Sequence, residues 1–239
     1  MARSFLSARL KDFVLLPINF SICGLEGSSK STSIKTINSV FEKYGYPLEK
    51  TREPGGTATA DRIRNLIKED VGGDELTSEA ELLLFFASRM QTKDIVVRKN
   101  LINGVSNCSD RSWWCSFAYQ AFDVMSNDLL DAFYFMKNRW ENGGFKYDAV
   151  LFLDVDPALG LVRAKGRGEL DRIERKDLLF FERARRGYLH LASVESNVTT
   201  ICANGSEEDV QEKVRLWAEN LISDMKASKI RNFSHNKIK

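Results

Sequence analysis

Two hydrophobic patterns alternate along this chain, and they predict strands and helices in turn. Residues 17–23 are predicted to form a short strand. Apolar side chains then recur at three- and four-residue spacing over residues 34–44, which is typical of one face of a helix. Residues 149–155 are apolar except for Asp154, the pattern of a strand buried on both faces, and residues 197–202 predict a last strand. The chain therefore passes repeatedly from strand to helix.

Local signals at two helix starts support this alternation. Ser78, with Glu81 three residues later, resembles a capping box ahead of the apolar-rich residues 80–102. Asp156 followed by Pro157 offers an N-cap and a first-turn proline directly after a predicted strand. Strands that alternate with helices in this way predict a parallel sheet covered by helices on both faces. No repeat or low-complexity linker interrupts the pattern, so we expect one α/β domain.

Composition and charge limit the classes of protein that fit. The chain has 239 residues, of which 43% are hydrophobic, enough to bury one sizeable core. Its 35 Lys and Arg residues nearly balance 33 Asp and Glu residues, and a net charge of +2 does not indicate a nucleic-acid partner. No apolar stretch reaches the roughly 18 to 20 residues of a membrane span, so no membrane partner is expected.

The cysteines and histidines restrict the chemistry further. The four cysteines include no C-x-x-C pair, which favours a reducing compartment, and we expect the cytoplasm. With only His190 and His235 in the chain, a His-rich zinc site and a His-centred triad are both disfavoured. The chemistry is therefore expected to depend on carboxylates, arginines, lysines and backbone amides.

The two ends of the chain differ from its centre. Residues 1–17 contain Arg3, Arg9 and Lys11 against a single acid, Asp12. We expect a disordered or loosely docked extension, and the alternative is an organelle-targeting segment, which an acid-poor start also fits. Residues 226–239 are polar and basic and predict a frayed tail. The domain itself is expected over residues 18–225.

Residues 24–31, with the sequence GLEGSSKS, lie between the first predicted strand and the first predicted helix. They nearly match G-x-x-x-x-G-K-[ST], in which backbone amides surround phosphate oxygens, the lysine reaches the outer phosphates and the hydroxyl binds Mg²⁺. Ser29 replaces the glycine before Lys30, and a Cβ at this position can strain the backbone. The segment predicts a phosphate-binding loop, and the alternative is a Ser/Gly turn that caps the helix.

Two further segments carry candidate ligands for a nucleotide. Arg52 ends a second predicted strand before a Pro-Gly-Gly turn, where its planar guanidinium can point at a phosphate. Phe85 and Arg89 are four residues apart and share one face of a predicted helix. An aromatic ring that stacks on a base and a guanidinium that binds its edge would suit a nucleotide pocket. The alternative is that Phe85 belongs to the core and Arg89 extends along the surface.

Charged residues also follow the third and fourth predicted strands. Asp110 can hold a Mg²⁺ shell or orient the neighbouring Arg111 towards a phosphate. Residues 163–174 are rich in arginine and contain two glycines, which indicates a mobile lid that brings positive charge to a transferring phosphoryl group. The alternative for this segment is a solvated helix face.

Taken together and in this order, these segments resemble the thymidylate kinase family from about residue 18 to about residue 225. The motifs are GLEG-x-x-K-[ST], TREPGGT, ELLLFxAxR, DR…AYQ and LDVDPALGLVRAxxRGELDRIE. The resemblance implies a P-loop kinase fold with a five-stranded parallel sheet, usually assembled as a homodimer. It also implies transfer of the γ-phosphoryl group of ATP to dTMP with Mg²⁺, which yields ADP and dTDP.

The resemblance implies a role for each matching residue. The residues expected to wrap the ATP phosphates are Gly24, Leu25, Glu26, Gly27, Ser28, Ser29, Lys30, Ser31 and Thr32. The residues expected to contact dTMP are Glu26 at the sugar hydroxyl, Arg52 and Arg111 at the phosphate, Phe85, Arg89 and Ser116 at thymine, Tyr119 beside the ribose 2′ position, and Gln120. The expected Mg²⁺ ligands are Ser31 and Asp110. The expected catalytic cations are Lys30, Arg111 and the lid arginines Arg163, Arg167 and Arg172.

Several positions depart from the family pattern. Ser29 interrupts the glycines of the loop, Cys23 stands where such relatives often carry an acid, and the expected third strand at residues 105–109 holds three polar residues. Burying an unpaired polar group costs about 1 to 3 kcal/mol, so these residues predict a less stable scaffold or a weaker enzyme. Two alternatives therefore remain: a nucleotide-binding pseudokinase with weak or no turnover, and a kinase of another nucleoside monophosphate.

Overall fold

A five-stranded parallel sheet forms the centre of the computed structural model, which describes residues 16–69, 72–122, 127–142, 145–166 and 172–236. The strands lie in the order β2-β3-β1-β4-β5, and every neighbouring pair is parallel. Their bounds are β1 Asn19–Cys23, β2 Leu48–Arg52, β3 Ser106–Asp110, β4 Ala149–Asp154 and β5 Val198–Cys202. The predicted α/β fold with a five-stranded parallel sheet is confirmed.

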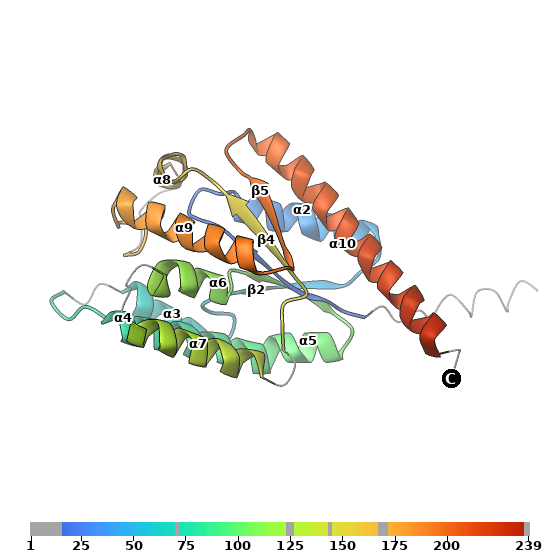
Figure 1. Ribbon diagram of the computed structural model, residues 1–239, viewed down its shortest axis with the longest axis horizontal. Helices are drawn as coiled ribbons and strands as arrows, with labels where there is room; N and C mark the ends of the chain where they lie inside the picture. Colours follow the sequence, from blue (N-terminus) through green and yellow to red (C-terminus); the bar gives the residue numbers. More distant parts are fainter. Residues whose placement is uncertain (1–15, 70–71, 123–126, 143–144, 167–171, 237–239) are drawn as a thin grey trace, which may run out of the picture.

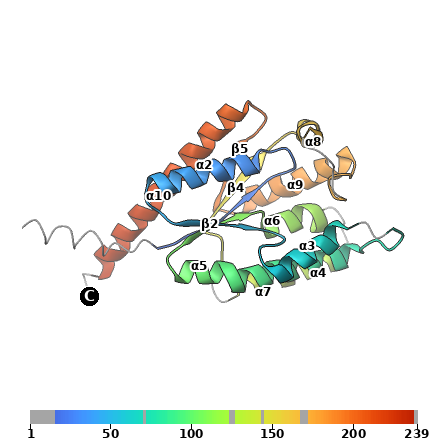
Figure 2. The same ribbon diagram turned by 180° about the vertical axis from the view of Figure 1, so that it is seen from behind.

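Helices cover both faces of the sheet (Figure 1). In the opposite view of Figure 2, α2 and α10 lie on one side of the strands, and α4, α5 and α7 lie on the other. The bounds are α2 Lys30–Lys43, α3 Ala58–Lys68, α4 Ser78–Thr92, α5 Arg98–Ile102, α6 Trp113–Ser116, α7 Asn127–Glu141, α8 Pro157–Lys165, α9 Leu178–Val194 and α10 Glu207–Asn236. Two π-helical segments, η1 Lys93–Val97 and η2 Phe117–Ala121, continue α4 and α6.

The predicted helix starts are confirmed in one case and shifted in the other. The Asp156 carboxylate accepts a hydrogen bond from the Leu159 amide at 3.1 Å, as an N-cap does. The predicted capping box at Ser78 and Glu81 is wrong, because Thr77 caps α4 instead and accepts from the Ala80 amide at 3.3 Å. The helix thus begins one residue earlier than a Ser78 cap would allow.

The polar residues of β3 are buried, but most of their polar atoms have partners. Ser106 Oγ accepts from the Ile18 amide at 3.2 Å, and Asn107 Nδ2 donates to Asn19 Oδ1 at 3.1 Å. Ser109 Oγ lies 3.0 Å from the hydroxyl of Thr51 on β2. Of these three side chains, only Asn107 has a polar atom, Oδ1, that is buried without a partner. The predicted penalty for unpaired polar groups in this strand is therefore confined to one atom.

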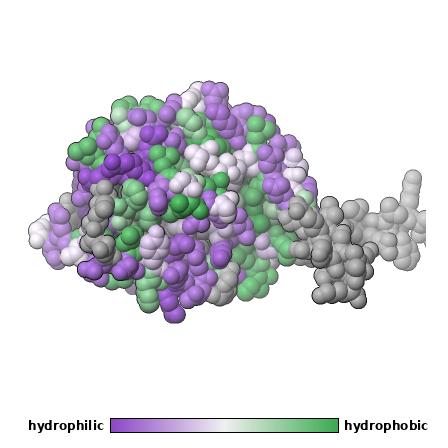
Figure 3. Space-filling view, in the orientation of Figure 1, coloured by the Kyte–Doolittle hydropathy of each residue, from purple (hydrophilic) through white to green (hydrophobic). Residues whose placement is uncertain are grey.

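The surface and the C-terminal helix complete the fold. Figure 3 shows hydrophilic and hydrophobic residues interspersed over the face that it draws. None of the helices in the described ranges combines the length and the apolar character needed to cross a membrane. The last helix, α10, continues through most of the predicted basic tail to Asn236 and projects beyond the sheet (Figure 1). The predicted segment 1–17 lies outside the described residues up to residue 15.

Candidate active site

The parallel strands bring the predicted motifs to one edge of the sheet. The glycine-rich loop follows β1, Glu53 follows β2 and Arg111 follows β3. Because all five strands run in the same direction, their carboxyl ends, and the segments that follow them, gather at this edge. Residues that are far apart in the sequence can therefore form one site.

The loop between β1 and α2 contains residues in the left-handed backbone conformation. Gly27 has φ 73°, and a Cβ there would lie 2.2 Å from the carbonyl oxygen of Gly160 in α8, so only glycine fits. Ser29 also adopts the left-handed conformation, with φ 64° and ψ 24°. The predicted strain at Ser29 is thus present. Its side chain makes no capping hydrogen bond to α2, which disfavours the alternative of a simple capping turn.

The ammonium group of Lys30 is bound by the loop itself. Its Nζ donates to the carbonyl oxygens of Gly24 and Leu25 at 2.9 and 2.6 Å, and to Ser28 Oγ at 3.3 Å. Burial and the nearby charge of Arg111 lower the pKa of Lys30 to about 8, although the carboxylate of Glu26 opposes this shift. The lysine is held at the centre of the loop by bonds that a phosphate ligand would have to replace.

A wide cavity opens beside this loop and encloses about 1280 Å³ of empty space. Its walls include residues 26–32, Asp110, Arg163 and the start of α10. Ser31 is exposed at the start of α2, and Asp110 Oδ2 lies 3.4 Å from Lys50 Nζ. The predicted loop residues, Ser31 and Asp110 therefore meet at one cavity, which we call the phosphate-side cavity.

The predicted lid arginines are separated by the structure. Arg163 donates to the carbonyl oxygens of Ala203 and Gly205 at 2.7 and 2.9 Å, so it fixes the turn between β5 and α10 at the wall of the phosphate-side cavity. Arg172 donates to the Ile67 carbonyl oxygen at 3.0 Å and forms an ion pair with Glu81. Arg167 lies outside the described residues.

A second cavity, which we call the substrate-side cavity, encloses about 690 Å³ on the other side of Glu26. Glu26 lines both cavities, and it is only 5% exposed. One carboxylate oxygen accepts from Arg111 Nη2 at 2.6 Å and the other accepts from the Tyr119 hydroxyl at 2.7 Å. Burial favours a raised pKa for Glu26, but the charges of Arg111 and Lys30 outweigh it and hold the pKa below its usual value. The carboxylate is therefore charged and fixed between two predicted substrate ligands.

Arg89 lies at the base of the substrate-side cavity, in a buried ion pair. Its Nε donates to Glu53 Oε2 at 2.5 Å, and its terminal nitrogens donate to the Ser112 carbonyl oxygen at 3.0 Å and to Ser116 Oγ at 3.4 Å. The other Glu53 oxygen accepts from the Tyr147 hydroxyl at 3.0 Å. Burial raises the pKa of Glu53 against the opposing charge of Arg89. The alternative that Arg89 extends along the surface is wrong, because its side chain is 1% exposed.

The remaining predicted substrate ligands divide into two groups. Phe85 is half-buried and lines the substrate-side cavity with Gln120, whose amide donates to Glu81 at 3.0 Å. Ser116 is fully buried beneath the cavity. Arg52 does not line the substrate-side cavity, and its guanidinium pairs with Asp61 at 3.0 Å on the surface. The structure therefore gathers most of this set but places Arg52 beside it.

Sequence reasoning missed several residues of this site. Glu53 lies inside the quoted TREPGGT motif, so its position was a usable signal. Tyr147 and Cys115 had no such signal, because Tyr147 reaches Glu53 across 94 positions and Cys115 joins the cavity wall from a short helix. Arg64 also lines the cavity and donates to the Pro54 carbonyl oxygen at 2.9 Å.

Comparisons with known proteins agree on one family. The family model described as thymidylate kinase matches residues 22–214. The thymidylate kinase of Vibrio parahaemolyticus is 41% identical over 211 residues, which cover 85% of this chain and 98% of that protein. The thymidylate kinase of Vibrio vulnificus is 42% identical over 205 residues, which cover 83% of this chain and 94% of that protein.

Proposed function

The chain belongs to the thymidylate kinase family, and we propose that its two cavities divide the substrates of that family's reaction between them. The reaction phosphorylates dTMP to dTDP, and the family uses ATP as the phosphoryl donor. In this proposal the substrate-side cavity binds dTMP and the phosphate-side cavity binds the ATP phosphates. The observation that carries the proposal is Glu26, whose carboxylate lines both cavities.

On the dTMP side, Phe85 stacks on thymine and Arg89 binds the edge of the base. The support for these roles is that both side chains line the cavity and that Arg89 is already oriented by Glu53. Arg111 holds the dTMP phosphate, and Tyr119 closes the space beside the ribose 2′ carbon. Both of these residues bond to Glu26, which also approaches the sugar hydroxyl.

Arg52, Gln120 and Ser116 complete the proposed dTMP site. Arg52 reaches the dTMP phosphate only if its guanidinium leaves Asp61, which is compatible with its half-exposed position. Gln120 lines the cavity beside Glu81, and Ser116 supports the guanidinium of Arg89 from below. Arg52 and Gln120 are thus proposed to adjust to the ligand, whereas Ser116 keeps its contact with Arg89.

On the ATP side, the loop from Gly24 to Thr32 surrounds the phosphates with backbone amides, and Lys30 contacts the outer ones. A magnesium ion, which would neutralise charge on the phosphates, fits the donors present. Ser31 offers a hydroxyl and Asp110 a carboxylate at the same cavity, and Mg²⁺ commonly takes one or two carboxylates and leaves its other positions to phosphate and water.

Phosphoryl transfer in this arrangement depends on position and charge. An oxygen of the dTMP phosphate attacks the γ-phosphorus while the bond to the bridging oxygen of ADP breaks, so the protein has little covalent work to do. Lys30 leaves the loop carbonyls and stabilises the charge on the outer phosphates. Arg163 acts by holding the turn at residues 203–205. Arg172 supplies charge from the lid segment only if its guanidinium leaves Glu81, and Arg167 is the other proposed source of that charge.

We also propose that the chain forms a homodimer and acts in the cytoplasm. Phe135 and Tyr134 on α7 are 64% and 43% exposed. Exposed aromatic side chains of this kind support a surface that a second copy of the chain could cover. The cysteines of the described residues are all free thiols, which fits a reducing compartment. Light scattering during size-exclusion chromatography should give twice the mass of one chain, and a monomer at all concentrations would contradict the dimer.

Steady-state phosphorylation tests the proposed function directly. ADP release and the phosphorylated product should be measured with ATP, Mg²⁺ and a panel of dTMP, dUMP, dCMP, dGMP and dAMP. We expect the highest kcat/KM for dTMP. No ADP release with any acceptor would support the pseudokinase, and a higher kcat/KM for another acceptor would support the kinase of a different nucleoside monophosphate.

A further inference from the structure

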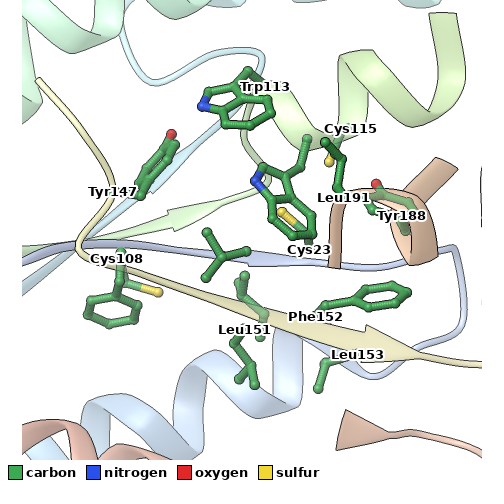
Figure 4. Packing of buried hydrophobic residues seen from close by; sticks show 14 of the residues in the cluster. Cys23, Cys108, Trp113, Cys115, Tyr147, Leu151, Phe152, Leu153, Tyr188 and Leu191 are labelled. Atoms are coloured by element: carbon green, nitrogen blue, oxygen red, sulfur yellow. The ribbon is translucent and has the colours of Figure 1, made fainter. Parts of the chain in front are cut away.

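Two of the cysteines lie together beside the substrate-side cavity. Cys23 ends β1 and Cys115 lies on α6, and Figure 4 shows both side chains in the packed region between these elements. Their shared neighbour is Ser112, whose Oγ is 3.1 Å from Cys23 Sγ and whose carbonyl oxygen accepts from the Cys115 amide at 3.0 Å. The two side chains are close enough that each shifts the pKa of the other. These residues form a dithiol cluster that the proposed kinase chemistry does not use.

The two sulfur atoms have opposite electrostatic environments. Burial alone would raise the pKa of Cys115, but the hydrogen bond from Cys23 and the positive charge of Arg111 lower it to about 5. Arg111 Nη1 lies 4.0 Å from the Cys115 sulfur. Burial and the neighbouring Cys115 raise the pKa of Cys23 well above its usual value. At neutral pH the pair therefore consists of a thiolate beside a thiol.

Only one member of the pair is open to small molecules. Cys115 lines the substrate-side cavity and is 7% exposed, whereas Cys23 is fully buried behind it. Cys108 is also fully buried, in β3, and burial raises its pKa far above the usual range. Cys202 is exposed at the end of β5, on the opposite edge of the sheet from β2. Cys115 is thus the thiolate that a reagent entering the substrate-side cavity meets.

We propose that Cys23 and Cys115 form a modification site that small-molecule disulfides oxidise through the substrate-side cavity. In the first step the Cys115 thiolate attacks one sulfur of RSSR, which forms a mixed disulfide and releases RS⁻. Cys23 then gives its proton to the released RS⁻, and its sulfur attacks the Cys115 sulfur and displaces the second RS⁻, which takes a proton from solvent. The net change is the oxidation of two protein thiols to one disulfide and the reduction of RSSR to two RSH.

The disulfide changes the site that Arg111 occupies. It ties the end of β1, from which the phosphate loop starts, to α6, and it removes the thiolate that lies 4.0 Å from the Arg111 guanidinium. We expect turnover of dTMP to fall by about tenfold or more and to return when dithiothreitol reduces the bond. The expectation that bound dTMP slows the first step rests on the proposed function, whereas the identity of the linked cysteines does not.

The test uses the full chain with Cys202→Ser, which removes the exposed thiol and leaves both cavities unchanged. The protein is treated with 2-hydroxyethyl disulfide, then alkylated, digested without reduction and examined by mass spectrometry. The expected product is one peptide pair joined through Cys23 and Cys115, with Cys108 alkylated only after unfolding. Dithiothreitol should remove the link and restore activity.

Two variants separate the steps of the reaction. Cys23→Ser should stop at a mixed disulfide on Cys115, because no second thiol can displace it, and Cys115→Ser should give no adduct at Cys23. Circular dichroism confirms that each variant is folded, and Cys115→Ala replaces Cys115→Ser if that variant unfolds.

A stable mixed disulfide on Cys115 in the protein that retains Cys23 would overturn the pair. An unmodified Cys115 under conditions that modify Cys202 in the unsubstituted chain would overturn the site. If the link forms equally fast with saturating dTMP, the dTMP assignment of the cavity fails while the dithiol site stands.

Discussion

The cations of the substrate-side cavity and the lysine of the phosphate loop are held in different ways. Arg89 and Arg111 each form a short ion pair with a buried carboxylate, Glu53 or Glu26. Lys30 hydrogen-bonds only to two carbonyl oxygens and one hydroxyl within the described part of the chain. Because an ion pair fixes its guanidinium before any ligand arrives, the substrate side is preorganised, whereas Lys30 must exchange its partners when phosphate binds.

The difference has a consequence for folding as well as for binding. If either partner of a buried carboxylate–arginine pair is removed, the other remains as a buried charge without a countercharge. Substitutions on the substrate side should therefore lower stability. Burial and Arg111 disfavour the charged form of Lys30, so removing that charge should cost the fold little. Substitutions of Lys30 should therefore affect catalysis more than stability. Substitutions on the two sides should therefore differ in which property they alter.

The largest effect is expected from Lys30→Ala. Removing the ammonium group should lower kcat by about a thousandfold (about 4 kcal/mol of barrier), because no other described lysine lines the phosphate-side cavity. Denaturant unfolding should change little. Lys35→Ala, on an exposed position of the same helix, serves as the matched control and should keep nearly full activity. If Lys30→Ala retained more than about a tenth of the wild-type rate, the phosphate-loop assignment would be wrong.

On the substrate side, Glu53→Gln should destabilise the fold. The free energy of unfolding should fall by about 3 kcal/mol, because the buried guanidinium of Arg89 loses its countercharge. The KM for dTMP should also rise more than the KM for ATP, since Arg89 faces only the substrate-side cavity. Urea unfolding and steady-state kinetics measure both effects, with Glu49→Gln on the exposed side of β2 as the control. Equal changes in the two KM values would mean that Glu53 has only a structural role.

Tyr119→Ala tests the sugar contact of the substrate side. Removing the ring opens space beside the ribose 2′ carbon, so discrimination against the ribonucleotide analogue of dTMP should fall by about 1 to 3 kcal/mol. Tyr119→Phe keeps the ring and loses only the hydroxyl bond to Glu26, so it should keep most of the discrimination. The measurement is the ratio of kcat/KM for the two nucleotides. An unchanged ratio in Tyr119→Ala would mean that this ring is ordinary core packing.

The pH profile of the phosphate side should report the lowered pKa of Lys30. Only the ammonium form binds phosphate, and burial with Arg111 lowers the pKa of Lys30 in the free enzyme to about 8. The kcat/KM for ATP should therefore fall by about tenfold per pH unit as the pH rises above 8. Lys30→Arg should lose this alkaline limb, because a guanidinium stays protonated there. A flat profile up to pH 10 in the wild-type chain would contradict the lowered pKa.

The fold was more predictable from the sequence than the contacts of the site. The apolar spacing over residues 34–44 predicted α2 because the buried face of a helix repeats every three to four residues. The motif order also placed Glu26, Arg111 and Tyr119 in one cavity. The sequence could not reveal Tyr147 beside Glu53, because that side-chain contact joins the residue after β2 to the segment before β4, and these two strands are not neighbours in the sheet.

Contacts to the backbone were also not predictable from the sequence. Arg163 was expected to supply charge from a lid, yet its bonds go to main-chain carbonyl oxygens of the turn after β5, and carbonyls carry no residue-specific signal. The half-exposed ion pair of Arg52 with Asp61 was missed for a related reason. Charged residues near a turn are common on protein surfaces, so their presence does not indicate which of them pair. The chemical identity of a residue was thus more predictable than its partner.

The smallest effect is expected from Ser29→Gly, which tests whether the phosphate loop keeps a tolerated defect. Ser29 has φ 64°, where a Cβ costs about 1 kcal/mol, and its hydroxyl makes no capping bond that glycine would lose. The substitution should therefore raise the free energy of unfolding by about 0.5 to 1 kcal/mol and hold or raise kcat. Ser39→Gly, at an exposed position within α2, should instead lower stability by a similar amount, because glycine is unfavourable in a helix interior. If Ser29→Gly greatly weakened ATP binding, Ser29 would itself contribute to that binding. The phosphate side would then be more preorganised than its contacts indicate.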